Sequence, residues 1–157
     1  MTTRIRAAVC REFGTPLTVE EIELAPPGPD QVQVRLEACA ICHSDISYAE
    51  GAWGGTLPAV YGHEGVGRIE TVGGAVTRLA PGDRVLVTLM RACGACPSCA
   101  GGRPAYCDEK YASRPSPLSL PGGAPVVHGL STGAFAEAAV VHASQVVKIS
   151  DDIPAES

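Results

Sequence analysis

The sequence lacks any apolar run approaching the ~20 residues that a membrane-spanning helix requires. Its start, from Met1 to Gly14, has no apolar core of the kind found in signal peptides. Basic runs longer than a few residues are also missing, and the net charge is -5, which argues against nucleic acid as a partner. We therefore expect a cytoplasmic protein with neither a membrane nor a nucleic acid among its partners.

Aromatic residues are scarce, at 4% of the 157 residues, and no glycine-rich GxGxxG turn opens a helix after a strand. The second absence means that no dinucleotide-binding turn is visible in the sequence. By contrast, 18 glycines and 13 prolines are present, and 45% of the residues are hydrophobic. This mixture argues against disorder and favours one domain of many short strands joined by tight turns.

Alternation of apolar and polar residues predicts where the strands lie. We expect them over residues 4–9, 17–22, 32–36, 66–72, 84–89, 134–141 and 145–149, with a turn at 81–83. Gly73 and Gly74 end one of these strands, and we expect a positive φ there. Short strands at this spacing predict a mainly β, barrel-like fold, interrupted by an irregular Cys/Gly/Pro lobe at about residues 91–112.

Four of the seven cysteines gather in this lobe with the spacing C-x2-C-x2-C-x7-C, at Cys93, Cys96, Cys99 and Cys107. In a reducing cytosol, cysteines are more often metal ligands or free thiols than disulfides. Four thiolates close a tetrahedral shell and leave no position for water, so the spacing predicts a structural zinc site. One alternative is an iron–sulfur cluster, whose bacterial pattern continues x3-C-P instead, and the other is a disulfide pair.

A second group of polar residues lies in two short segments, Cys42-His43-Ser44-Asp45 and Gly62-His63-Glu64. Taken singly, each residue has an ordinary interpretation as a small buried thiol, a hydrogen-bonded histidine or a surface charge. Together they supply one thiolate, one imidazole and carboxylates able to orient them. That is the composition of a catalytic zinc site with its supporting residues.

The same residues carry a resemblance to a known family. The pattern G-H-E-x2-G-x5-G-x2-V is met at every fixed position, by Gly62-His63-Glu64, Gly67, Gly73 and Val76. The segments ACAICHSD (38–45) and PGDRV (81–85) and the spacing of the lobe cysteines are similar too. The sequence from about Arg6 to Ile149 thus resembles the N-terminal catalytic domain of zinc-dependent medium-chain alcohol dehydrogenases. The resemblance implies one domain over 1–157 with a GroES-like, partly open β-barrel.

The resemblance also implies roles for single residues. Cys42 and His63 would be two of the three protein ligands of a catalytic zinc, and Glu64 would lie beside the metal and approach it. Asp45 would support His63, and Ser44 would bind the alcohol hydroxyl and pass on its proton. The implied enzyme interconverts small alcohols and aldehydes or ketones with NAD or NADP, and its full-length form is a homo-oligomer.

Further positions match places where the family binds its ligands. His43 stands where the family often has a basic residue against the cofactor pyrophosphate. Trp53 and Leu89 are similar in position to residues that line the substrate pocket. Ser47 departs from the pattern, because many members have at this position a histidine that completes the proton relay.

The family pattern continues beyond the sequence given. Its third zinc ligand and its Rossmann nucleotide-binding domain come later, after a segment similar to residues 145–154. We therefore expect residues 1–157 to be a catalytic domain that is inactive alone. The first alternative is a stand-alone zinc-binding module of this barrel type without catalysis. The second is a zinc-free, quinone-reductase-like relative, against which the intact Cys42/His63 pair counts.

Overall fold

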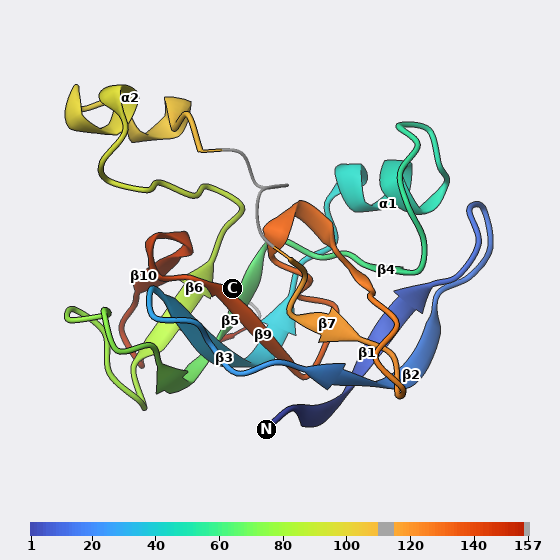
Figure 1. Ribbon diagram of the computed structural model, residues 1–157. Helices are drawn as coiled ribbons and strands as arrows, with labels where there is room; N and C mark the ends of the chain where they lie inside the picture. The colour runs from blue at the N-terminus through green and yellow to red at the C-terminus, as the bar shows by residue number, and fades with distance from the viewer. Residues whose placement is uncertain (110–114, 156–157) are drawn as a thin grey trace.

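The computed structural model describes residues 1–109 and 115–155, and its strands form two five-stranded sheets (Figure 1). The first sheet has the order β7-β2-β1-β4-β8, with β1 Thr3–Cys10, β2 Thr18–Leu24, β4 Ala59–Val60, β7 Leu118–Ser119 and β8 Val127–His128. The second has the order β10-β6-β5-β3-β9, with β3 Gln31–Cys39, β5 Gly65–Val72, β6 Arg84–Val87, β9 Ala138–His142 and β10 Val146–Lys148. Paired strands are antiparallel except for β4 and β8.

The helical segments are short. Among the described residues, two are α-helical, α1 His43–Ala49 and α2 Pro97–Ala100, and three are single 3-10 turns, η1 Pro104–Tyr106, η3 Gly129–Ser131 and η4 Ala143–Gln145. The lobe that contains α2 stands apart from the two sheets, whereas α1 lies above the end of the first sheet (Figure 1). In residues 1–109 and 115–155, no helix combines the length and the hydrophobicity needed to cross a membrane.

Residues 135–137 join the two sheets into a nearly closed barrel. On one side, the backbone N–H of Ala8 donates to the carbonyl of Phe135 (2.8 Å), and Ala7 forms a bridge with Ala136. On the other side, the N–H of Leu36 donates to the carbonyl of Glu137 (2.9 Å). One short segment therefore bonds to β1 and β3 at once, which confirms the barrel-like β fold.

The barrel interior is filled by the alternate residues of the strands, as a period of two requires. In the first sheet, Ile5 on β1 lies opposite Ile22 on β2, and both are buried. They belong to one cluster with Ala7, Val9, Leu24, Val60, Leu118, Val126, Ala138 and Val140. A second cluster contains Val32, Val34, Ile69, Val85, Val87, Ala139, Val141 and Val146. On β1, β2 and β3 the alternation seen in the sequence is therefore that of the core, whereas residues 138–141 of β9 are all buried.

Several sequence expectations are shifted or wrong in detail. The strand expected over 134–141 begins only at Ala138, because residues 135–137 serve as the junction between the sheets. The two-residue strands β4, β7 and β8 and the helix α1 were not expected. Residues 110–112 of the expected lobe lie outside the described residues.

The expectation of a positive φ at Gly73 and Gly74 is wrong, since neither is among the glycines with positive φ. Gly73 is instead a point of close approach, where an added Cβ would lie 2.0 Å from the carbonyl oxygen of Gly28. Gly67 is similar, because a Cβ there would lie 2.0 Å from the carbonyl oxygen of Arg35 on the neighbouring strand β3. Both positions exclude a side chain for steric reasons rather than for backbone conformation.

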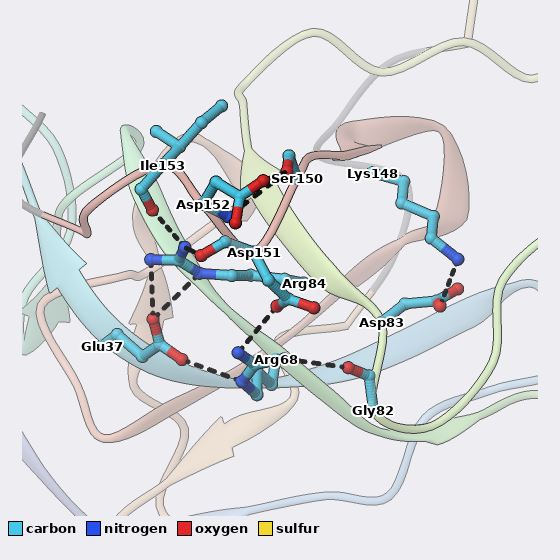
Figure 2. A network of polar contacts seen from close by, with 10 residues as sticks. All are labelled: Glu37, Arg68, Gly82, Asp83, Arg84, Lys148, Ser150, Asp151, Asp152 and Ile153. Carbon is cyan, nitrogen blue, oxygen red and sulfur yellow. Dashed lines mark hydrogen bonds and ion pairs between the residues drawn. The ribbon is translucent and has the colours of Figure 1, made fainter.

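A buried arginine ties the segment after β10 to the second sheet (Figure 2). Arg84, on β6, is 6% exposed and donates from Nε to Glu37 Oε2 on β3 (3.2 Å). The same guanidinium donates to the carbonyl oxygens of Asp151 (3.1 Å) and Ile153. Arg68 joins the network from the surface, 2.8 Å from Asp151 Oδ1. The chain is thereby held against the barrel up to Ile153.

Candidate metal centres

Cys42 caps the start of α1 in an extended conformation. Its backbone N–H donates to Asp45 Oδ2 (3.1 Å), one turn into the helix. A carboxylate at this position stabilises a helix start, because it satisfies a free backbone donor and complements the helix dipole. The sequence Cys-His-Ser-Asp therefore determines where the helix begins and places Cys42 immediately before its first turn.

Asp45 also reaches across to the segment that carries His63. Its Oδ1 accepts a hydrogen bond from the backbone N–H of Gly62 (3.0 Å) and lies 3.1 Å from His63 Nδ1. Both side chains are buried, with 2% of Asp45 and 4% of His63 exposed. A histidine held at Nδ1 by a carboxylate presents Nε2 for metal binding, an arrangement common to metal-ligating histidines.

The ligand atoms of Cys42, His63 and Glu64 all lie within 4.8 Å of one another. Glu64 Oε1 is 3.9 Å from His63 Nε2, and 51% of the Glu64 side chain is exposed. Thiolate sulfur, imidazole nitrogen and carboxylate oxygen are the ligand types that zinc takes in proteins. The described residues thus offer three donors that fit zinc, one of them on the solvent side.

The α1 helix adds two further residues that the sequence pattern singled out. Ser44 Oγ lies 3.5 Å from His63 Nε2, so its hydroxyl faces the same point as the three donors. His43 is the first residue of the helix and is exposed to solvent. The structure therefore brings Ser44 into the cluster and leaves His43 at its surface, available to a ligand from outside the chain.

Trp53 and Leu89 occupy different surroundings. Trp53 is 60% exposed and packs edge-on against Tyr48, with ring centroids 4.9 Å apart. Tyr48 stacks in turn on Tyr61, and burial raises the pKa of Tyr61 to about 12. Leu89 is half-buried beyond the end of β6. Within the described part of the chain, no hydrogen bond or ring contact joins Trp53 to the Cys42 cluster. The sequence pattern did not predict the aromatic group of Trp53, Tyr48 and Tyr61.

The four lobe cysteines form a second cluster, with all their sulfur atoms within 4.8 Å of one another. Backbone N–H groups point at these sulfurs: Cys93 donates to Cys107 (3.3 Å), Cys96 to Cys93 (3.3 Å) and Cys99 to Cys96 (3.4 Å). Asp108 also donates from its N–H to the sulfur of Cys96 (3.4 Å). The backbone is wrapped around the four sulfurs as a metal-binding lobe requires.

The chemistry of this donor set fits a cation. Desolvation, with a further contribution from the three neighbouring cysteines, raises the pKa of Cys99 to about 12. The Cys99 thiol thus resists ionisation until a cation lies beside it, and a divalent metal that favours sulfur supplies that charge. All seven cysteines lie within the described residues and are free, so the structure does not favour the disulfide alternative.

The base of the lobe is fixed by contacts that no sequence motif indicated. Arg91, whose side chain is 4% exposed, lies 2.6 Å from Glu109 Oε1. The backbone N–H of Ala92 donates to Ser144 Oγ in the η4 turn (2.9 Å). Inside the lobe, Ser98 Oγ donates to Asp108 Oδ1 (3.0 Å), which lowers the pKa of Asp108.

Comparison with known proteins identifies the family. The model of the alcohol dehydrogenase GroES-like domain matches residues 28–151, most of the chain. The chain belongs to this family. The alcohol dehydrogenase class-P of Arabidopsis thaliana is 38% identical over 162 residues, which cover 96% of this chain and 42% of the relative. The chain therefore spans less than half the length of the curated alcohol dehydrogenases it matches.

Solved structures of alcohol dehydrogenases superpose on most of the chain. An alcohol dehydrogenase zinc-binding domain protein from Burkholderia ambifaria has a TM-score of 0.91 and 36% identity, covering 99% of this chain and 44% of that one. Benzyl alcohol dehydrogenase from Acinetobacter calcoaceticus has a TM-score of 0.83 and 33% identity, covering 98% and 43%. The barrel and its lobe are therefore those of the family.

Proposed function

We propose that this chain is the catalytic domain of a zinc-dependent alcohol dehydrogenase, which reversibly oxidises a small alcohol to an aldehyde or ketone with NAD or NADP. The observation that carries the proposal is the cluster of Cys42, His63 and Glu64, with the buried carboxylate of Asp45 behind the histidine. Such a carboxylate orients a metal-binding histidine, while it also accepts the backbone N–H groups of Cys42 and Gly62. Membership of the alcohol dehydrogenase family supports the reaction.

Two groups of residues would hold zinc. Cys42 and His63 would bind the catalytic ion, with Glu64 beside it, and a third permanent ligand would come from outside residues 1–157. When bound there, zinc supplies Lewis-acid polarisation of the substrate oxygen. The four lobe cysteines, Cys93, Cys96, Cys99 and Cys107, would hold a structural ion, because their closed shell of sulfurs leaves no position for substrate.

The protein's own residues divide the remaining work. Asp45 holds His63 through Nδ1, so that Nε2 keeps one direction. Ser44, whose hydroxyl lies 3.5 Å from that Nε2, would accept the hydroxyl proton of the alcohol at Oγ and release its own hydroxyl proton to water. His43, exposed at the start of α1, would meet the pyrophosphate of the nicotinamide cofactor. Trp53 and Leu89 would contribute to the wall of the substrate pocket.

The proposal is tested on the full-length protein that contains this domain, by alcohol-dependent reduction of NAD and of NADP. We expect Ser44→Ala to lower turnover about 10²–10⁴-fold, the usual contribution of a positioned acid–base group, with zinc content unchanged. Ser47→Ala, on the same helix and also half-buried, is the matched control and should keep near wild-type turnover.

Three results would count against the proposal. Turnover of Ser44→Ala near that of the wild type would remove the serine from the proton path. Steady cofactor reduction by residues 1–157 alone would show that the domain needs neither a further ligand nor a further cofactor site. An absence of alcohol oxidation in the full-length protein, with zinc bound, would favour the non-catalytic zinc-binding module instead.

A further inference from the structure

Three polar side chains, those of Asp30, His142 and Ser144, meet at the end of β9. None of them is among the candidate metal ligands of the described residues. Strand β3 pairs with β9 and places Gln31 opposite His142, and the backbone N–H of Ala143 donates to the carbonyl of Asp30 (2.9 Å). The pairing of two strands therefore brings together a carboxylate, an imidazole and a hydroxyl from distant parts of the sequence.

His142 contacts the other two residues, one with each ring nitrogen. Its Nδ1 lies 2.7 Å from Ser144 Oγ and also accepts the backbone N–H of Ser144 (3.1 Å). Its Nε2 lies 3.4 Å from Asp30 Oδ2. A ring nitrogen that accepts an N–H carries no proton, so the neutral ring has its proton on Nε2, where it faces the carboxylate. Nδ1 is thereby free to take a proton from the Ser144 hydroxyl.

The Ser144 hydroxyl is accessible, since Ser144 is exposed in the η4 turn. Its proton points to His142 Nδ1, and its oxygen accepts the backbone N–H of Ala92 (2.9 Å). A hydroxyl oxygen has two lone pairs, and the N–H of Ala92 uses one of them. The other is available to attack an electrophile, with the base already beside it.

A serine, a histidine and a carboxylate in this order activate the serine for acyl transfer, and such a group is recognised by geometry and roles rather than by fold. The contact of Ser144 with His142 lies within the usual reach of about 2.6–3.2 Å between a nucleophile and its base. The contact of His142 with Asp30 is slightly longer, as such contacts often are before a substrate binds.

A cavity of about 390 Å³ adjoins the imidazole, because His142 forms part of its wall. The side chain of His142 is 14% exposed, so the ring is not sealed inside the protein. The wall is largely apolar, with Pro117, Val127 and Val140 among its residues. Its volume falls within the range of about 300–1,000 Å³ that is usual for small-molecule sites. An apolar acyl chain fits a wall of this kind, and an aryl oxygen leaves readily once a serine has attacked.

We propose that Ser144 hydrolyses aryl esters of apolar carboxylic acids, with His142 as its base and Asp30 orienting His142. Ser144 Oγ bonds to the ester carbonyl carbon while its proton passes to His142 Nδ1. The bond from that carbon to the aryl oxygen breaks, and the aryl oxygen takes the proton. Water then bonds to the acyl carbon and gives a proton to Nδ1, which returns it to Ser144 Oγ as the acid leaves. The site does not depend on the proposed function, because it uses none of the residues assigned to the metal centres.

The test uses p-nitrophenyl hexanoate with the full-length protein that contains this domain. The reaction is quenched with acid, and the acylated residue is located by peptide mass spectrometry, which separates this site from ester hydrolysis at a metal centre. We expect a hexanoyl group on Ser144 and none on Ser150. Ser150 is the matched control, because it is also exposed but its Oγ donates to a carboxylate, Asp152 Oδ2 (3.2 Å), instead of a histidine. Hexanoyl groups only on other residues, or equally on Ser144 and Ser150, would overturn the proposal.

One variant separates the base from the structural contact. His142 also caps η4, because its ring accepts the N–H of Ser144. His142→Asn keeps a favoured capping residue but has no basic nitrogen. We expect it to slow acylation of Ser144 about 10²–10⁴-fold, the usual contribution of a positioned base, while alcohol oxidation is unchanged. Acylation at the wild-type rate would overturn the proposal, because the serine would then react without its base.

Asp30 is tested through the tautomer of His142. In protein labelled with ¹⁵N-histidine, we expect the neutral ring to carry its proton on Nε2. Asp30→Asn should lower the share of this tautomer, because its amide N–H can donate to Nε2, and acylation of Ser144 should slow with it. An unchanged tautomer in Asp30→Asn would overturn the role of Asp30. A proton on Nδ1 in the wild type would overturn the whole assignment, even if every variant failed to fold.

Discussion

The carboxylate of Asp45 contacts three separate parts of the candidate catalytic site. One oxygen accepts from the N–H of Cys42, and the other accepts from Gly62 and faces His63 Nδ1. One buried side chain therefore fixes the start of α1, the backbone at Gly62 after β4 and the direction of the His63 imidazole. At the scale of single residues, the geometry of the cluster rests on Asp45 as much as on the donors themselves.

His128 gives a prediction on pH at the same scale. Its pKa in the fold is about 4, mainly because of burial, against about 6.5 in an unfolded chain. Between these values the unfolded state binds more protons, so stability falls as the pH is lowered from about 6.5 to about 4. We expect the advantage of wild type over His128→Phe in free energy of unfolding to decrease over this interval by roughly 3 kcal/mol.

Ring-proton NMR of His128 checks the same point directly, with a titration midpoint expected near pH 4. Both proteins contain the same cysteines, so the loss of metal in acid cancels in the difference between them. A midpoint near the ordinary value for histidine, or a stability difference that does not depend on pH, would contradict the account.

At the scale of elements, the cysteine lobe and the barrel are held together in different ways. The barrel has two apolar clusters, whereas α2 and η1 contain no buried residue. The lobe is fixed by N–H groups on cysteine sulfurs and by the pair of Arg91 and Glu109 at its base. Its shape therefore depends on what the sulfurs bind.

Replacing Cys96 by Ser tests this dependence. The sulfur of Cys96 accepts N–H groups of Cys99 and Asp108, so its removal takes away both a ligand and a backbone anchor. We expect hydrogen exchange to accelerate roughly tenfold or more over residues 93–107, with β1 and β2 unchanged. Cys39→Ser, outside the lobe, is the control and should leave exchange in the lobe as in the wild type. Equal acceleration in lobe and barrel would show that the lobe is not a separate unit.

The segment after β10 depends on Arg84 (Figure 2). Arg84→Met would leave Glu37 and the carbonyls of Asp151 and Ile153 without this donor. We expect a loss of about 2–3 kcal/mol in the free energy of unfolding and faster exchange at residues 150–153. Arg68→Met is the matched control, since Arg68 is 46% exposed and surface pairs contribute about 0–1 kcal/mol. Similar losses in the free energy of unfolding for Arg84→Met and Arg68→Met would contradict this prediction.

At the scale of the whole molecule, local patterns predicted the parts that local chemistry determines. The alternation of Ile5, Ala7 and Val9 predicted β1 because one face of that strand is buried. The cysteine spacing predicted a convergent lobe because two-residue gaps bring sulfurs together. The same reasoning could not find α1, whose seven polar-rich residues show no helical period and are held by the contact of Asp45 with Gly62.

Features that depend on distant partners were missed or misread. The two residues of β7 form a strand only because Leu118 pairs with Leu24, far away in the sequence. Gly73 is required by the close approach of Gly28, which the local sequence does not reveal. His128 becomes unusual only when β8, η3 and β9 enclose it. These are properties of the assembled barrel rather than of any segment.

We propose two metal sites of different kinds in this chain, one closed by four cysteines and one open at Cys42, His63 and Glu64. The most direct measurement is the zinc content per chain by elemental analysis, with zinc in excess and again after dialysis against a mild chelator. A closed shell of thiolates should retain its ion, whereas a site with fewer ligands open to water should lose it.

The account predicts close to two zinc ions per chain in excess zinc and close to one after dialysis. His63→Ala should have one under both conditions, because only the open site is removed. Protein that retains no zinc after dialysis, or is brown with iron, would contradict the closed site. If His63→Ala and the wild type bind the same amount of zinc when zinc is in excess, the open site is contradicted, and with it the proposed catalytic centre.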